Sequence, residues 1–524
     1  MEEKPQHGSL GGLVAGVREE YESGRTKELE WRKAQLGGLI RMITEEEDAI
    51  FDALHDDLGK HRVESFRDEV GVLAKSVRNT LQNLKKWASP EKVDVPLISF
   101  PCNARVVPEP IGVVLIFSCW NLPIGLALEP LSGAIAAGNA VVLKPSEFAP
   151  STAAFLAANI PKYLDANAVK VVQGGAEVGE ELMEHRWDKV LFTGNARVGR
   201  IIMTKAAKHL TPVALELGSK CPCIVDCLDS KRECQVAVNR IIGAKWSTCA
   251  GQACVAIDYI LVEEQFAPFL IELLKSTLKR FFTEPEYMAR ILNEKHFHRL
   301  TNLLEDDQVK SSIVHGGNAD PKTLWIEPTI VLNPPFDSDI MMEEIFGPLL
   351  PIITVKKTED CIAFLKSKPK PLAIYAFTNN EKLKQRIVAE TSSGSVLFND
   401  AIVQRRAHDA PSGRKEAVGS AGPRPGWAVL GRKDRKDPNR KYGLDSVPFG
   451  GIGESGFGQY HGKYTFELFS HRKAVVRRSL LVEFMFRYPP WDEYKMGMLR
   501  RVFRFDYVSL VLALLAFWLL GIRR

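Results

Sequence analysis

The chain has 524 residues, of which 45% are hydrophobic and 25% charged, and its formal net charge is +5. This composition is ordinary for a globular protein with two or three domains, and the charge is too small to indicate a nucleic-acid partner. No apolar run follows the polar start at residues 1–8, so a secretory signal peptide is not expected.

Charged, periodic sequence without proline predicts helices over residues 17–60, and another helical region is expected over 69–87. Prolines at 90, 96 and 101 then mark an extended stretch. Further on, short apolar runs alternate with helical segments, which indicates a parallel α/β sheet followed by a second α/β domain. The runs predicted as strands are 113–117, 140–143, 169–172 and 189–192, and then 221–225, 260–262 and 350–355.

Nine cysteines without a signal peptide favour reduced thiols in the cytosol. Four of them, Cys221, Cys223, Cys227 and Cys234, are clustered and raise the question of a zinc site. Their spacing matches no standard zinc pattern and no histidine lies among them, so we expect no metal. A buried strand over 221–225 that leads into a loop explains the cluster better.

Two later stretches differ from the rest of the chain. Residues 405–441 are rich in glycine, proline and charge and carry a net charge of +7, which leaves −2 for the remainder. This composition predicts disorder. Residues 507–522 form an uncharged run of sixteen, flanked by arginines on both sides. The run is slightly short for a membrane span, and we expect a C-terminal membrane anchor that either spans the bilayer or lies in its interface.

Cys254, in the run Gly251–Cys254, is the candidate nucleophile, because small residues precede it and allow a substrate close to the backbone. Glu216, 38 positions earlier, is a carboxylate that can serve as a base. Asn121, after the strand at 113–117, offers an amide N–H for an oxyanion. For Asn121 alone, a turn-forming role before Pro123 is the simpler interpretation.

Two further strand ends suggest a nucleotide site. Glycines at 194 and 199 allow backbone N–H groups to face a pyrophosphate at a helix N-terminus, although the ordinary dinucleotide fingerprint is absent. Lys144 and Glu147 can hydrogen-bond ribose hydroxyls at the carboxyl edge of the sheet. An uninvolved strand–helix turn and a solvated charge pair are the respective alternatives.

Together these fragments resemble the aldehyde dehydrogenase superfamily, over about residues 10–404 and 442–480. The segment 456–462 is similar to the class 3 branch, which includes fatty aldehyde dehydrogenases, and residues 220–260 resemble its plant members. The motifs that carry the resemblance are Glu216–Lys220, Gly251–Cys254, Glu344–Pro348, Pro448–Gly451 and Gly456–Gly462.

The resemblance implies a role for each matching residue. Cys254 would attack the aldehyde, Asn121 and the Cys254 backbone N–H would form the oxyanion hole, and Glu216 would be the general base. Lys144 and Glu147 would bind the adenine-side ribose of NAD or NADP. The turn with Gly194, Asn195 and Gly199 would hold the pyrophosphate, Glu344 and Phe346 would position the nicotinamide ribose and ring, and Phe449 would line the substrate channel.

The resemblance also implies an aldehyde dehydrogenase-like α/β fold, with a Rossmann-type cofactor domain, an α/β catalytic domain and a small β bridging element for a homodimer. We expect oxidation of medium- or long-chain aldehydes to carboxylic acids, on the cytosolic face of the endoplasmic reticulum or, without an anchor, in the cytosol. The expected boundaries are 1–95 and 109–217 for the NAD(P)-binding domain, 218–404 and 442–466 for the catalytic domain, and 96–108 and 467–480 for the bridging element.

This sequence departs from the family pattern at three places. Ser219 stands where a second glycine is usual and would be unfavourable if that position needs positive φ, and Asn195 replaces a commoner serine. Residues 405–441 interrupt the family pattern next to the segment with Phe449. They are either a regulatory loop or, as we favour, translated intron sequence. If they obstruct the substrate mouth, the chain would be a catalytically impaired, membrane-tethered NAD(P)-binding protein, and acyl transfer without oxidation is a further alternative.

Overall fold

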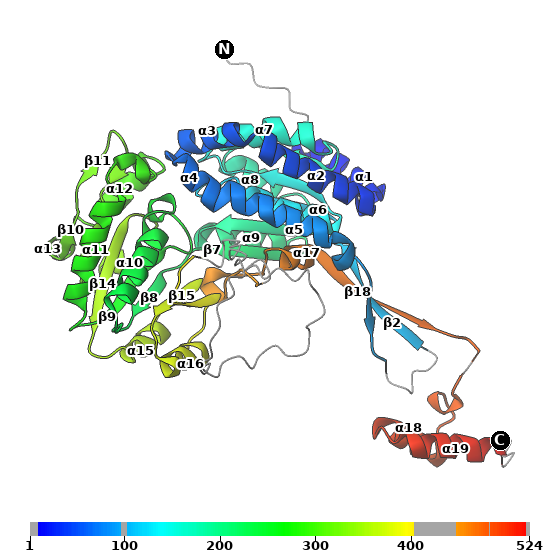
Figure 1. Ribbon diagram of the computed structural model, residues 1–524. Helices are drawn as coiled ribbons and strands as arrows, with labels where there is room; N and C mark the ends of the chain where they lie inside the picture. Colours follow the sequence, from blue (N-terminus) through cyan, green and yellow to red (C-terminus); the bar gives the residue numbers. More distant parts are fainter. Residues whose placement is uncertain (1–8, 96–101, 403–446, 482, 520–524) are drawn as a thin grey trace, which may run out of the picture. The chain divides into compact units, whose positions relative to one another are not determined.

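The computed structural model describes residues 9–95, 102–402, 447–481 and 483–519, so the insertion predicted at 405–441 lies outside the described residues. Two compact units are present. The larger comprises residues up to 84 together with 110–469, and the smaller comprises 85–109 and the residues from 470 onward. The larger unit contains two extended sheets with helices packed on them (Figure 1).

The first sheet has six strands in the order β17-β7-β6-β3-β4-β5. Strands β3 (Val113–Phe117) and β4 (Ala140–Lys144) are buried along their whole length, as expected for a parallel sheet covered on both faces. All neighbours run parallel except β17, which is antiparallel to β7. The four apolar runs predicted as strands here are therefore confirmed. The other strands are β5 (Val169–Val171), β6 (Lys189–Gly194), β7 (Val213–Leu217) and β17 (Gly456–Phe457).

The helical stretch predicted over 17–60 is divided into several helices. The last of them ends at Leu58, and the next residue, Gly59, has a φ of +64° that takes the chain out of the helix. A short α-helix and a π-helical turn follow and lead into a long helix, so the predicted helix over 69–87 is also present. The helices are α1 (Leu10–Glu22), α2 (Leu29–Glu45), α3 (Glu47–Leu58), α4 (Arg62–Ser65), the π turn η2 (Phe66–Val70), α5 (Gly71–Trp87), α6 (Gly125–Ala137), α7 (Pro150–Tyr163), α8 (Ala176–Leu182) and α9 (Ala196–Ala207).

The second sheet has seven strands in the order β10-β13-β14-β9-β8-β15-β16, parallel except for β10. The strands predicted at 221–225, 260–262 and 350–355 are confirmed, and buried Cys221 and Cys223 belong to the first of them. The strands are β8 (Cys221–Val225), β9 (Ile257–Glu263), β10 (Ile313–His315), β13 (Thr329–Leu332), β14 (Leu349–Val355), β15 (Ala373–Phe377) and β16 (Ser395–Phe398). The main helices around them are α10 (Lys231–Lys245), α11 (Ala267–Phe281), α12 (Glu294–Asn302), α15 (Asp360–Lys366) and α16 (Glu381–Glu390).

A connection of only three residues, 218–220, joins the end of β7 to the start of β8. A linker of this length spans about 14 Å at most, so the carboxyl edge of the first sheet and the amino edge of the second lie next to each other. In the first sheet the strand order reverses between β3 and β6, the kind of position at which open α/β sheets bind ligands. The two edges therefore define where a site can form.

The smaller unit contains a three-stranded sheet in the order β1-β2-β18. Its strands are β1 (Glu91–Val93), β2 (Cys102–Pro110) and β18 (Ser470–Arg478). The ion pairs Arg472–Glu91 and Lys473–Glu109, each 2.9 Å, join β18 to the other two segments. The stretches predicted as a bridging element, 96–108 and 467–480, thus supply strands to one sheet.

The C-terminal residues of the smaller unit form two helices, α18 (Glu493–Phe503) and α19 (Tyr507–Leu519). Buried Met498 and Leu510 share a small apolar cluster, so the two helices pack on each other. No helix within the described part of the chain is long and apolar enough to cross a membrane. The membrane span that was one of the two expectations for 507–522 is therefore not supported by the described residues, and 520–522 lie outside them.

Candidate functional site

Cys254 follows a tightly turned segment that precedes strand β9. Three consecutive residues of this turn, Cys249, Ala250 and Gly251, have positive φ values of 49°, 52° and 77°. Such values are unfavourable for residues with a side chain and persist mainly at functional sites. A Cβ atom at Gly251 would lie 2.4 Å from the carbonyl oxygen of Gly347, so only glycine allows this approach. The turn therefore packs the nucleophile segment directly on the segment that contains Gly347.

The side chain of Gln252, which is 1% exposed, fixes the same turn from inside. Its Nε2 donates to the carbonyl oxygens of Cys249 and Arg290, both at 3.0 Å, and its Oε1 accepts from the N–H of Leu292 at 3.1 Å. Both ends of the amide are therefore hydrogen-bonded to the backbone. Gln252 was not predicted as a functional residue, although it belongs to the motif quoted for Cys254.

Asn121 reaches the nucleophile segment from the first sheet. Its side chain is buried in the loop after β3, and Nδ2 donates to the carbonyl oxygen of Gln252, two residues before Cys254, at 2.9 Å. The other amide atom, Oδ1, is also buried, and no described residue donates to it. The structure thus brings the predicted oxyanion donor and the loop of the predicted nucleophile together, although 131 positions separate the two bonded residues.

Glu216 is buried near the end of β7. The antiparallel strand β17 places Gly456 opposite it, and a Cβ atom at Gly450 would lie 3.2 Å from Glu216 Oε1. The same Cβ would be 2.0 Å from the carbonyl oxygen of Gly458. Glycine is therefore needed at position 450 so that the segment after the insertion can pass beside the carboxylate.

Glu344 lies at the junction between the two sheets. Its Oε1 accepts from the N–H of Ser219 at 2.9 Å, and a Cβ atom at Gly218 would fall 2.0 Å from Oε2, so the carboxylate occupies the space that a side chain would take. Burial and the negative charge of Asp258 raise the pKa of Glu344 to about 8. Asp258 is itself paired with Lys220.

Ser219, where a glycine was expected, is well accommodated. Its φ is not in the left-handed region, and its hydroxyl accepts from the N–H of Leu372 at 2.7 Å. Serine at this position therefore gains a hydrogen bond that glycine could not make.

Phe346 has a φ of +49°, unusual for a bulky residue, and its ring stands edge-on to Trp120 at 5.4 Å between centroids. His296 lies on the same indole at 5.3 Å. Trp120 precedes Asn121 directly, so the predicted nicotinamide-ring residue packs on the loop that carries the predicted oxyanion donor. This contact was not foreseen from the sequence.

The predicted ribose-binding pair lies at the carboxyl end of β4. Lys144 is almost fully buried and its Nζ donates to Glu147 Oε2 at 2.6 Å, while the Glu147 side chain is 35% exposed. The ammonium group can donate to the two neighbouring hydroxyls of a sugar, and the partly exposed carboxylate can accept from them. This donor and acceptor set suits a ribose.

The turn after β6 leads into helix α9 at the reversal point of the sheet. Asn195 caps the helix, because its Oδ1 accepts from the N–H of Val198 at 3.0 Å. The N–H of Gly199 donates to the carbonyl of Asn195, and a Cβ atom there would lie 3.1 Å from Leu217. Gly199 therefore allows α9 to pack closely on β7 rather than offering a free N–H to phosphate. The helix N-terminus still suits an anionic group, so the residues present fit a dinucleotide.

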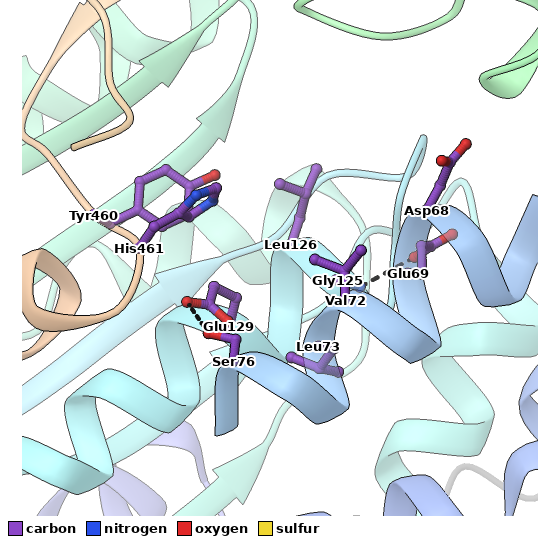
Figure 2. A pocket seen from close by; sticks show the side chains of 10 residues that line it. All are labelled: Asp68, Glu69, Val72, Leu73, Ser76, Gly125, Leu126, Glu129, Tyr460 and His461. Atoms are coloured by element: carbon purple, nitrogen blue, oxygen red, sulfur yellow. Dashed lines mark hydrogen bonds between the residues drawn. The ribbon is translucent and has the colours of Figure 1, made fainter. Parts of the chain in front are cut away.

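A small hollow of about 40 Å³ lies between α5, α6 and the segment with Tyr460 and His461 (Figure 2). Phe449, predicted to line the substrate channel, does not line this hollow; its ring stacks on His461 at 5.0 Å between centroids and is 2% exposed. The residues that face the hollow were missed, although Tyr460 and His461 belong to the class 3 signature. The lining residues are Asp68, Glu69, Val72, Leu73, Ser76, Gly125, Leu126, Glu129, Tyr460 and His461.

A family model described as the aldehyde dehydrogenase family matches residues 13–424. The chain belongs to the aldehyde dehydrogenase family. It is 49% identical over 503 residues to aldehyde dehydrogenase family 3 member F1 of Arabidopsis thaliana, which covers 95% of this chain and 96% of the relative. It is 40% identical over 490 residues to the rat "aldehyde dehydrogenase, dimeric NADP-preferring", with 92% and 98% covered.

Among solved structures, the substrate-bound state of Staphylococcus aureus AldH superposes with a TM-score of 0.84 at 36% identity, covering 95% of this chain and 100% of that one. These aldehyde dehydrogenase relatives confirm the expected fold class and the resemblance to family 3. The chain is thus an oxidoreductase that oxidises aldehydes with NAD or NADP as the kind of cofactor.

Proposed function

We propose that this aldehyde dehydrogenase oxidises aldehydes through a thioester on Cys254, with Asn121 as oxyanion donor and Glu216 as general base. The observation that carries the proposal is the 2.9 Å hydrogen bond from Asn121 Nδ2 to the carbonyl of Gln252. It holds a buried amide donor on the very turn that presents Cys254, which is the arrangement that acyl chemistry at a cysteine requires.

The chemistry follows from the residues. An ordinary cysteine, with a pKa of about 8.5, is only a few per cent thiolate at neutral pH, so proton removal must accompany attack. When the Cys254 sulfur adds to the aldehyde carbon, the oxygen becomes an oxyanion that the Asn121 amide and the Cys254 N–H stabilise. One such donor contributes about 3 kcal/mol to the transition state.

The second half of the reaction needs a base. After hydride leaves the former aldehyde carbon, the thioester on Cys254 must be hydrolysed. Buried Glu216 would take a proton from the attacking water as the general base. The acid product then leaves and the thiol is restored.

The cofactor would be held by Lys144 and Glu147 at the adenine ribose and by Glu344 and Phe346 at the nicotinamide riboside. The turn at Gly194 and Asn195, where α9 begins, would face the pyrophosphate, and Gly199 would contribute by letting α9 pack closely on β7. When bound, the cofactor supplies the hydride acceptor. The Glu147 carboxylate next to Lys144 would repel a 2′-phosphate, which favours NAD+ over NADP+. The expected boundaries of the NAD(P)-binding domain, 1–95 and 109–217, belong to the same proposal.

Medium- and long-chain aliphatic aldehydes are the proposed substrates. Their tail would extend toward the hollow of Figure 2, which is lined by Gly125. Gly125 follows the loop between β3 and α6 that carries Asn121, which we call the oxyanion loop. A homodimer through the sheet of the smaller unit is proposed, in line with the word "dimeric" in the rat relative's name.

We further propose that the C-terminal helices lie in a membrane interface on the cytosolic face of the endoplasmic reticulum. Trp491, Phe503, Phe505 and Leu512 are all more than 60% exposed, and Arg500, Arg501 and Arg504 accompany them. Exposed aromatic and apolar side chains with arginines are typical of interfacial helices.

The deciding experiment compares NADH production by the wild type, Cys254→Ser and Cys227→Ser with aldehydes of increasing chain length and with each cofactor. Cys227, an exposed thiol two residues after the end of β8, serves as the control. Cys254→Ser should lose at least about 10³-fold in kcat because serine is a far weaker nucleophile at neutral pH. Full activity of Cys254→Ser would reject the mechanism.

A further inference from the structure

A buried ion pair lies beside the oxyanion loop and has no role in the mechanism described above. Lys60, just after α3, and Glu69, in the π turn η2, are joined by a bond of 2.6 Å between Nζ and Oε1, and both side chains are 0% exposed. Buried ion pairs are expensive because both charges lose their water, and apolar residues of the same volume often replace them without loss. A buried pair whose polar atoms are all hydrogen-bonded can, however, fix the geometry of the segments that it joins.

Within the described part of the chain, the other side-chain hydrogen bonds of this pair reach the loop that carries Asn121 and the first residue of α6. Lys60 Nζ donates to the carbonyl oxygen of Asn121 at 2.8 Å. Glu69 Oε2 accepts from the N–H groups of Ile124 and Gly125 at 2.9 and 3.0 Å, where α6 begins; the last of these bonds is drawn in Figure 2. The pair therefore holds the loop at two places, on the oxyanion residue itself and on the helix that follows.

The charge state of the pair is secured by its surroundings. Burial alone would lower the pKa of Lys60, but the negative charge of Glu69 and its hydrogen bond to the ammonium oppose this effect, and the pKa is raised, so the ammonium keeps its protons. Glu64 accepts from the N–H of Cys249 at 2.6 Å, at the start of the turn that leads to Cys254. The α3–α5 region thus touches both loops that form the oxyanion hole.

We propose that Lys60 and Glu69 are positioning residues that fix the direction of the Asn121 amide toward the oxyanion. The inference rests on the proposed role of Asn121. The backbone of Asn121 is held by Lys60 and its side chain by Gln252, so the amide has one orientation before substrate arrives. Preorganised donors of this kind are effective because they need no rearrangement during the reaction.

The test is a double-mutant cycle with the full-length enzyme, hexanal and NAD+. Lys60→Met and the charge-neutral double substitution Lys60→Met/Glu69→Leu are each made in the wild type and in Asn121→Ala. If the pair acts through Asn121, either change lowers kcat by about 10- to 100-fold in the wild type, with KM for NAD+ altered less than about threefold. In Asn121→Ala the same change should lower kcat by less than about threefold.

Equal losses in both backgrounds, or no loss in the wild type, would overturn the proposal. Full kcat in Asn121→Ala would instead refute the proposed function of Asn121, so the two failures are distinguishable. If a lone buried Glu69 prevents Lys60→Met from folding, the neutral double substitution supplies the same comparison. Arg32→Met is the matched control: Arg32 is a buried cation that donates to the carbonyl of Ala136 at the other end of α6, and its loss should lower Tm without changing kcat.

Discussion

Substitution of Gly251 by alanine gives the sharpest test of the nucleophile turn. A Cβ atom at this position would lie 2.4 Å from the carbonyl oxygen of Gly347 and 2.9 Å from that of Lys245. Ordinary contact begins at 3.4 Å, so the turn and the backbone of Gly347 must separate by about 1 Å. The φ of +77° adds about 1–2 kcal/mol of strain for any side chain, and forced overpacking adds about 1–3 kcal/mol.

A displacement of about 1 Å at a catalytic group typically lowers the rate by about 100-fold. We therefore expect Gly251→Ala to lower kcat for aldehyde oxidation by about that factor and to lower Tm, both measured on the purified enzyme by NADH absorbance and thermal unfolding. Gly243→Ala is the matched control, because a Cβ there meets nothing within 4 Å and alanine favours the helix α10. A kcat for Gly251→Ala within about threefold of the wild type would show that the close approach does not set the position of Cys254.

Two further predictions concern the junction between the sheets. In the folded protein Glu344 has a pKa of about 8, whereas in the unfolded chain its carboxyl group has the ordinary pKa of a glutamate. Between about pH 5 and pH 8 the folded state therefore binds a proton that the unfolded state has released. The free energy of unfolding falls progressively over this range as the pH rises. Glu344→Gln should gain in Tm relative to the wild type over that range, and a constant Tm difference across it would contradict the assignment. Ser219→Ala should lower the free energy of unfolding by about 1–2 kcal/mol, because the N–H of Leu372 loses its acceptor; an unchanged denaturant midpoint would count against this hydrogen bond.

The sequence predicted the fold class well because the central strands of both sheets, such as β3, β4 and β14, are continuous apolar runs. Strands such as β3 and β14 are buried on both faces, so nearly every residue in them is apolar and the strand can be predicted from its local sequence alone. The environment of residues 507–522 was harder to predict, because an apolar composition indicates burial but does not distinguish burial in lipid from burial against protein. The contact between Met498 and Leu510 answers that question in part for α19.

The candidate site was only partly accessible from the sequence. Cys254, Glu216 and Asn121 could be named from local motifs, yet nothing in those motifs places Asn121 on the carbonyl of Gln252. The role of Phe449 at the substrate channel stays a prediction; the structure shows only that its ring stacks on His461, which faces the hollow together with Tyr460. Gln252 was overlooked because its contribution is a set of hydrogen bonds to residues up to 40 positions away.

By itself, the sequence determined the alternation of strands and helices, the membership of the aldehyde dehydrogenase family and the identity of the candidate nucleophile, since each is carried by short local patterns. Only the tertiary structure decided that a buried pair, Lys60 and Glu69, holds the oxyanion loop, and that Glu344 fills the space left open by Gly218. Those features depend on contacts between segments distant in the chain. The stabilising contacts of these residues depend on burial and on close packing of distant backbone segments. Both arise only when the two sheets and their helices have packed together.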